Sequence, residues 1–133
     1  MATPIPDSHA DLLRADRKTF AHLALTMSDG SPQVTPMWFA FDGESVYFNT
    51  ARGRVKDRIM RKKPRVAFSI QDPEIPYRYI QVRGQVVEET EEGAWEHICD
   101  LCEKYSGHRN YPVYEGQVRV IYKVKLEHAN TMG

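Results

Sequence analysis

The chain has 133 residues, of which 41% are hydrophobic and 27% charged, and we interpret residues 1–133 as one globular domain. Its 18 basic and 18 acidic residues balance, which argues against a general nucleic-acid-binding protein. No apolar run approaches the roughly 20 residues of a membrane span, and the N-terminus lacks the apolar core of a signal peptide. We therefore expect a cytoplasmic protein with no membrane partner.

The first part of the chain is expected to form a short helix and then three strands. Residues 6–16 suit an amphipathic helix with Asp7 or Ser8 as its N-cap. Apolar residues then alternate over residues 20–27, and the sequence SDGS predicts a tight turn. We expect PQVTPMWFAF to return as one strand, and a second Asp-Gly pair to lead into the strand ESVYFNT. These three strands would form a meander.

The second part alternates helices and strands. A helix over residues 54–63 is expected to end before Pro64, and the strand RVAFSI follows it. The sequence YRYIQVRGQVVEE predicts a long strand in which Gly84 marks a bulge or a barrel corner. An acidic helix is predicted over residues 90–105, and a final strand over residues 118–126. About six strands with few helices indicate a closed or nearly closed antiparallel barrel.

Cys99 and Cys102, in the sequence CDLC, have two functional interpretations, a redox pair or half of a zinc site. No second pair of metal ligands at matching spacing is evident, and the residues around the cysteines recur at helical spacing. We therefore expect two reduced thiols on the acidic helix and no metal site. His97, on the same helix, is expected to be solvated.

The most unusual feature is a basic segment. Eight of the 18 Lys and Arg residues lie within residues 52–65, together with a single acid. A solvated helix face, a nucleic-acid-binding patch and a phosphate site are all compatible with it, although the neutral net charge weakens the second. A phosphate site would combine hydroxyl, amide and backbone N–H donors at a strand end with cations at a helix start. The sequence NTARGRVK supplies these parts in Asn49, Thr50, Gly53, Arg54 and Lys56.

The stretch GSPQVTPMWFAFDGESVYFNTARGRVKDRIMRKKPRVAFSI resembles the pyridoxamine 5'-phosphate oxidase-like, FMN-binding split-barrel family. Within that family it looks most like the branch that uses the deazaflavin coenzyme F420. The similarity continues through DPEIPYRYIQVRGQVVE, the acidic helix and EKYSG. The resemblance implies a mainly β (α+β) fold, a six-stranded antiparallel split β-barrel with two to three short helices. It also implies a homodimer with the cofactor at the subunit interface.

The resemblance assigns cofactor-binding residues position by position. The cofactor phosphate would be held by Asn49, Thr50, Arg54 and Lys56. The flat ring system would be bordered by Val34, Thr35, Pro36, Met37 and Trp38. Arg52 could meet the acidic tail of F420, and Val55 completes the expected cofactor-binding set. F420 is the preferred cofactor, and FMN is the alternative.

The implied activity is that of an oxidoreductase. Reduced F420 would transfer a hydride to a small unsaturated organic acceptor of the quinone, tetrapyrrole or enone type. No catalytic side chain is assigned, because the cofactor carries the chemistry in such enzymes. The alternatives are an FMN-binding pyridoxamine-phosphate-oxidase-like protein, and a non-catalytic barrel that binds a cofactor or nucleic acid.

Overall fold

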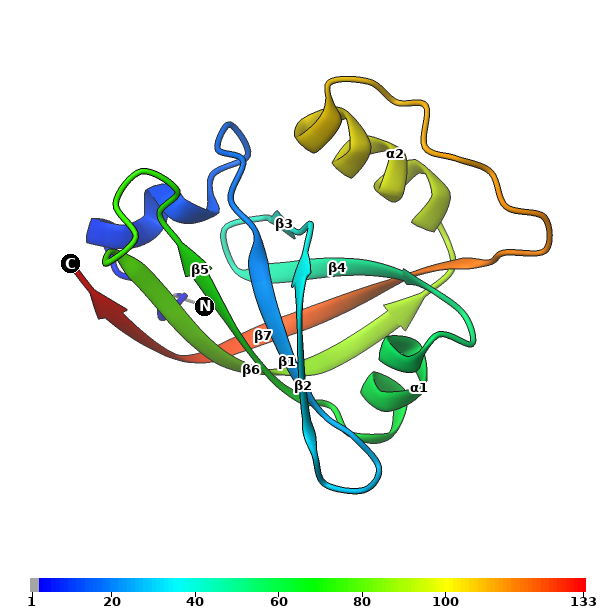
Figure 1. Cartoon of the computed structure of the whole chain (residues 1–133), viewed down its shortest axis with the longest axis horizontal. Helices are drawn as coiled ribbons and strands as arrows, with labels where there is room; N and C mark the ends of the chain where they lie inside the picture. The colour runs from blue at the N-terminus through cyan, green and yellow to red at the C-terminus, as the bar shows by residue number, and fades with distance from the viewer. Residues whose placement is uncertain (1–2) are drawn as a thin grey trace.

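The computed structural model describes residues 3–133 and shows a single curled antiparallel sheet with three helices packed around it (Figure 1). In chain order the elements are η1 (Asp7–Leu13), β1 (Ala21–Thr26), β2 (Pro32–Met37), β3 (Ala40–Phe41), β4 (Ser45–Ala51), α1 (Val55–Lys62), β5 (Arg65–Gln71), β6 (Tyr79–Thr90), α2 (Ala94–Ser106) and β7 (Arg119–Met132). The predicted mainly β fold with two to three short helices is confirmed, although the sheet has seven strands where six were expected.

The order of the strands explains how the sheet becomes a barrel. The strands lie side by side as β2-β1-β5-β6-β7-β4-β3, so β2 and β3 form the two edges. Only Trp38 and Phe39 separate β2 from β3 in the sequence, and the chain therefore ties the two edges together at this point. The sheet is thus curled into a half-barrel whose edges are joined at one end and do not pair along their length, which is consistent with the expected split barrel.

The predicted meander is wrong in one respect. Both predicted turns are present, since the Met27 and Asp42 amides donate to the carbonyls of Ser31 and Ser45 at 2.8 and 3.2 Å. However, β2 pairs with β1 and β3 pairs with β4, whereas β2 and β4 do not pair. The expected single strand is interrupted because the chain turns inward to bury the Phe39 side chain completely.

The helices differ from the predictions mainly at their ends. The N-terminal helix is a 3-10 helix whose N-cap is Pro6 without a side-chain cap bond, so the predicted cap is wrong. Helix α1 fits its prediction, whereas α2 begins four residues later than predicted because β6 continues through Thr90. Among the residues described, no helix is long and apolar enough to cross a membrane.

Large apolar side chains fill the barrel. Phe48 and Phe68 pack edge to face with ring centroids 5.6 Å apart, and neither is more than 2% exposed. The predicted irregularity at Gly84 is confirmed, because the register of β6 and β7 shifts between Arg83 and Gly84. A Cβ at Gly84 would collide with the backbone carbonyl oxygen of Lys125. Glycine at this position therefore lets β6 and β7 approach closely.

The N-terminal segment is fastened to one end of the barrel by an ion-pair cluster. Arg17 donates to Asp11 and Asp72 at 2.6 and 3.2 Å, and Arg78 donates to Asp72 at 2.8 Å and also to Asp11. The Nε2 atom of His9 lies 3.0 Å from the carbonyl oxygen of Met132, which places η1 beside the C-terminus (Figure 1). These contacts join three distant parts of the chain.

Candidate functional site

A pocket of about 230 Å³ lies where the end of β4, the start of α1, α2 and the loop before β7 meet. Its walls are formed by Pro36, Met37, Trp38, Asn49, Thr50, Arg54, Lys56, Ile98, Leu101, Tyr111 and Arg119. Seven of the predicted cofactor-binding residues are thus brought together. Val34, Thr35, Arg52 and Val55 are not part of this wall.

Three cations converge on the pocket without acidic partners. Within residues 3–133, the side chains of Arg54 and Lys56 form no hydrogen bond or ion pair. Partial burial, together with the charge of Arg54, lowers the pKa of Lys56. Burial also lowers the pKa of Arg119, whose side chain has no carboxylate partner in the described part of the chain. Of the three, Arg119 is buried, Lys56 is partly buried and Arg54 is exposed. An anion in the pocket would supply the counter-charge that the buried Arg119 lacks, because buried charges in proteins are ordinarily paired.

The local backbone adds further donors to this cluster. Gly53 adopts a left-handed conformation with φ of 87°, which turns the chain from β4 into α1. The first N–H groups of α1 have no partners within the helix, and a helix N-terminus favours an anion. Thr50 is buried at the pocket wall, and its hydroxyl forms no hydrogen bond within the described residues. The arrangement has the donor types that a phosphate needs.

Arg52 differs from the other predicted cations. Its guanidinium donates to Asp57, Glu89 and Glu91 at 3.0, 3.2 and 2.9 Å. These three carboxylates neutralise it and hold it away from the pocket. Val55 is partly buried against the core, and Val34 is 61% exposed on the edge strand.

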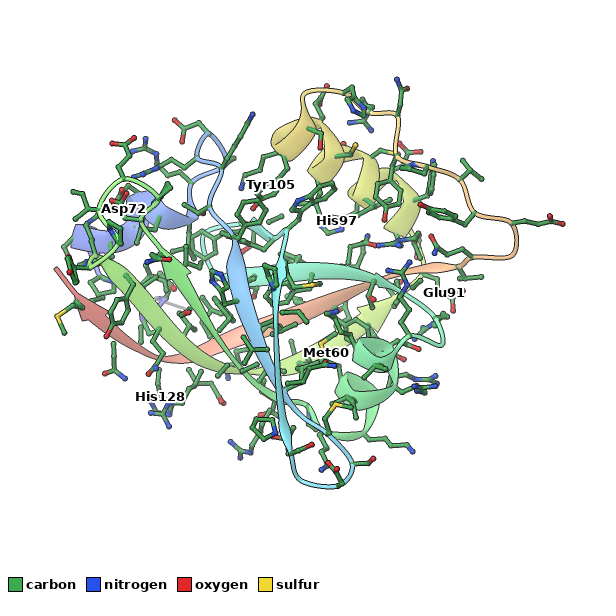
Figure 2. The ribbon with its side chains drawn as sticks, viewed as in Figure 1. Met60, Asp72, Glu91, His97, Tyr105 and His128 are labelled. Carbon is green, nitrogen blue, oxygen red and sulfur yellow. The ribbon has the colours of Figure 1, made fainter. Side chains whose placement is uncertain are left out.

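Asn49 is buried, and its amide bonds only to protein groups. Its Nδ2 atom donates to the carbonyl oxygen of Ala94 at 2.9 Å and lies 3.0 Å from Nδ1 of His97. Its Oδ1 atom accepts from Nε of Arg119 at 2.8 Å. His97 projects from α2 toward the sheet (Figure 2) and is partly buried rather than solvated, so that expectation is wrong. Burial lowers the pKa of His97.

Aromatic side chains border the pocket on the side of α2. The rings of Trp38 and Tyr105 are stacked, with centroids 5.3 Å apart and planes 2° apart. Tyr111 meets the edge of Trp38 at 6.4 Å, and the guanidinium of Arg119 lies 5.2 Å from the centre of the Tyr111 ring. Tyr105 also points from α2 toward the sheet (Figure 2) and donates to the carbonyl oxygen of Thr19 at 2.6 Å. The pocket thus combines a cationic end with an aromatic wall.

Comparison with known proteins identifies the family. The sequence profile described as pyridoxamine 5'-phosphate oxidase matches residues 5–132. The chain belongs to the pyridoxamine 5'-phosphate oxidase family. No curated protein matches the sequence significantly.

Solved structures of family-like proteins share the fold. An F420 reductase is 35% identical, with 95% of this chain and 98% of that one covered and a TM-score of 0.81. A putative pyridoxamine 5'-phosphate oxidase from Listeria innocua is 19% identical over 94% of this chain and 95% of that one, with a TM-score of 0.71. A conserved hypothetical protein from Mycobacterium tuberculosis is 23% identical, covers 96% and 84% of the two chains, and has a TM-score of 0.68. The last two similarities concern the fold alone.

Sequence reasoning missed one polar residue of this family member's pocket, Arg119. Arg119 lies opposite Ala51 in the β4–β7 ladder, which places it diagonally beside Asn49. The alternation of the last strand indicates that Arg119 faces away from its apolar side, but it does not identify the neighbouring strand. The pairing of β4 with β7 spans some seventy residues, and no short motif encodes it.

Proposed function

We propose that this protein is an F420-dependent oxidoreductase that acts on a small unsaturated organic acceptor. The observation that carries the proposal is the convergence of Arg54, Lys56 and Arg119, without an acid, on a pocket with an aromatic wall. The 35% identity to a solved F420 reductase over nearly the full length of both chains supports F420 over other phosphate-bearing cofactors. FMN is the second candidate because the family match is to pyridoxamine 5'-phosphate oxidase.

The residues of the pocket divide into two roles in this proposal. Arg54, Lys56 and the hydroxyl of Thr50 would hold the cofactor phosphate at the start of α1. Met37 and Trp38 would border the ring system on the aromatic side of the pocket. When bound, reduced F420 would supply a hydride to a quinone, a tetrapyrrole or an enone. The protein's own part is to bind and orient the cofactor and to exclude water.

A homodimer belongs to the same proposal. The pocket of about 230 Å³ is smaller than the roughly 300–1,000 Å³ that encloses a drug-sized ligand. The neighbouring edge strand β2 carries an exposed Val34. A second subunit over this edge would enlarge and close the groove.

An anaerobic turnover assay tests the proposal. Reduced F420 is mixed with the protein and, in separate reactions, a quinone, biliverdin and a cyclic enone, and the return of oxidised F420 is followed by its absorbance. We expect turnover of at least one acceptor, and loss of most of it in Arg54→Ala and Lys56→Ala. Binding of neither F420 nor FMN, together with salt-sensitive binding of single-stranded DNA, would instead support the nucleic-acid alternative.

A further inference from the structure

We propose that Arg119 is an anion-binding residue of the pocket, and that Asn49 and His97 are positioning residues that hold it there and contact no ligand themselves. The inference rests on the proposed function in one point only, namely that the anion is taken to be the phosphate of the cofactor. It changes the role that the family resemblance implies for Asn49, from phosphate ligand to support. It also adds a strand, β7, to the elements that bind the anion.

The environment of Arg119 suits the binding of an anion. The residue is only 7% exposed, yet its hydrogen bonds go to the neutral oxygens of Asn49, Tyr111 and Gln117. Its Nη2 atom has no hydrogen-bond partner among the described residues, and the side chain lines the pocket. Taking a guanidinium out of water without a counter-charge is costly. A ligand anion in the pocket would offset that cost.

Arg119 is not a lone cation at this place. Arg54 and Arg119 both line the pocket. Burial lowers the pKa of Arg119, and the positive charge of Arg54 lowers it further, against the influence of Tyr111. Lys56 also lines the pocket, and burial followed by the charge of Arg54 lowers its pKa as well. Three cations from α1 and β7 thus surround one space. This arrangement suits an anion with several oxygens better than a single carboxylate.

Asn49 has no hydrogen-bond donor left for an anion, and an anion binds through donors. One hydrogen of Nδ2 serves the Ala94 carbonyl at the start of α2, and the other serves Nδ1 of His97. Oδ1 accepts from Nε of Arg119. The amide thereby fixes the direction of the guanidinium and joins it to α2. Since Nδ1 of His97 accepts, the neutral ring carries its proton on Nε2, and this orientation keeps the Asn49 amide from turning over.

Binding measurements on matched variants test the first half of the proposal. Wild type, Arg119→Gln and Lys125→Gln are titrated with F420 by fluorescence and with inorganic phosphate by NMR. Lys125→Gln is the control, because it removes one positive charge from the same strand at an exposed position outside the pocket. We expect Arg119→Gln to weaken both affinities about ten- to a hundredfold, and Lys125→Gln to change them less than about twofold.

A double-substitution cycle tests the second half. Asn49→Ala should weaken binding several-fold in the wild-type background and have no further effect in Arg119→Gln, because Asn49 acts only through Arg119. If Asn49 bound the phosphate directly, the losses of affinity in the two single variants would instead multiply in the double variant. If Arg119→Gln unfolds, Arg119→Lys takes its place, since lysine lacks the Nε–H that bonds to Asn49. Thermal unfolding of each variant establishes that it is folded at the temperature of the titration.

The outcomes separate this inference from the proposed function. Phosphate binding that depends on Arg119, without binding of F420 or FMN, supports the inference and contradicts the cofactor assignment. F420 binding that is unchanged in Arg119→Gln overturns the inference and leaves the cofactor assignment standing. If the losses of affinity multiply in the double variant, Asn49 itself binds the anion, and its positioning role is overturned. Wild-type protein that binds neither phosphate nor F420 overturns both.

Discussion

At the scale of single residues, the pocket combines cations that have no hydrogen-bond or ion-pair partner within residues 3–133 with an amide whose nitrogen and oxygen are both hydrogen-bonded to protein groups. Arg54 and Lys56 have none among the described residues, whereas Asn49 uses its whole amide on protein groups. A buried cation without a counter-charge, such as Arg119, costs the folded chain free energy that a ligand anion can return. Asn49 in turn holds the guanidinium of Arg119 at the pocket wall.

His97 predicts a pH dependence of stability. Burial lowers its pKa below the ordinary value of 6.5, so the unfolded chain takes up a proton at a higher pH than the folded one. The stability that the neutral ring provides is therefore present above pH 6.5 and is lost as pH falls toward the lower folded pKa. We expect the thermal midpoint to decline over this range in wild type and to decline less in His97→Gln. Scans at several pH values, with His22→Gln on β1 as the control, check this.

Most residues that line the site could be predicted from the sequence, but the role of each one could not. Thr50, Arg54 and Lys56 lie within seven residues of each other, so a strand-to-helix motif is enough to bring them together. Arg119 joins them only through the β4–β7 pairing, and Asn49 reaches His97 only because α2 packs over β4. Such long-range contacts depend on the whole barrel, and the local sequence does not contain them.

At the scale of elements, α1 is fixed to the barrel by a buried hydrogen bond. The hydroxyl of Tyr122 on β7 donates to the Asp57 carboxylate at 2.5 Å, and Asp57 also accepts from the Gly53 amide at 2.9 Å. Tyr122→Phe would leave a buried carboxylate with one donor fewer, and we expect a loss of about 1–3 kcal/mol in the free energy of unfolding. Urea unfolding measures it.

Tyr47→Phe is the matched control for that change. The hydroxyl of Tyr47 also donates to an aspartate, Asp42, at 2.6 Å, but that carboxylate lies at an exposed turn. Water can replace the lost donor there, so the expected loss is less than about 1 kcal/mol. Equal losses in the two variants would show that Tyr122 does not anchor α1 in the way described.

The close approach of β6 and β7 makes a second prediction at this scale. Gly84→Ala would push a Cβ into the carbonyl oxygen of Lys125, and backbone must move to admit it. We expect a destabilisation of about 1–3 kcal/mol or more in urea. Gln81→Ala, at an exposed position on the same strand, should change stability by less than about 0.5 kcal/mol. A Gly84→Ala variant as stable as wild type would contradict the tight packing of the two strands.

Turns, helices and most strands could be predicted because each depends on neighbouring residues. Asp-Gly pairs, Pro64 and the alternation of β6 all act over a few positions. The break between β2 and β3 could not be predicted in this way, since it arises from the burial of Phe39 where the sheet edges meet. A local pattern of alternating residues continues across this break.

At the scale of the whole molecule, the ion-pair cluster ties η1 to the barrel and predicts how the protein responds to acid. The Glu74 amide and then Arg78 lower the pKa of Asp72 to about 2. Ionised Asp72 thus stabilises the fold above pH 3.8, and this contribution is lost as pH falls toward 2. Asp72→Asn should lower the thermal midpoint at neutral pH and flatten its fall in acid. Glu74→Gln, in the same loop, is the control and should keep the slope of wild type.

For the molecule as a whole, we propose above all that this family member binds F420 through the cations at the start of α1. The most direct measurement is a parallel titration of cofactor-free protein with F420 and with FMN, followed by quenching of tryptophan fluorescence. We predict tighter binding of F420 than of FMN, and a loss of about ten- to a hundredfold in Arg54→Ala and in Lys56→Ala without loss of fold. Preference for FMN would contradict the choice of cofactor, and affinities unchanged by both substitutions would contradict the site itself.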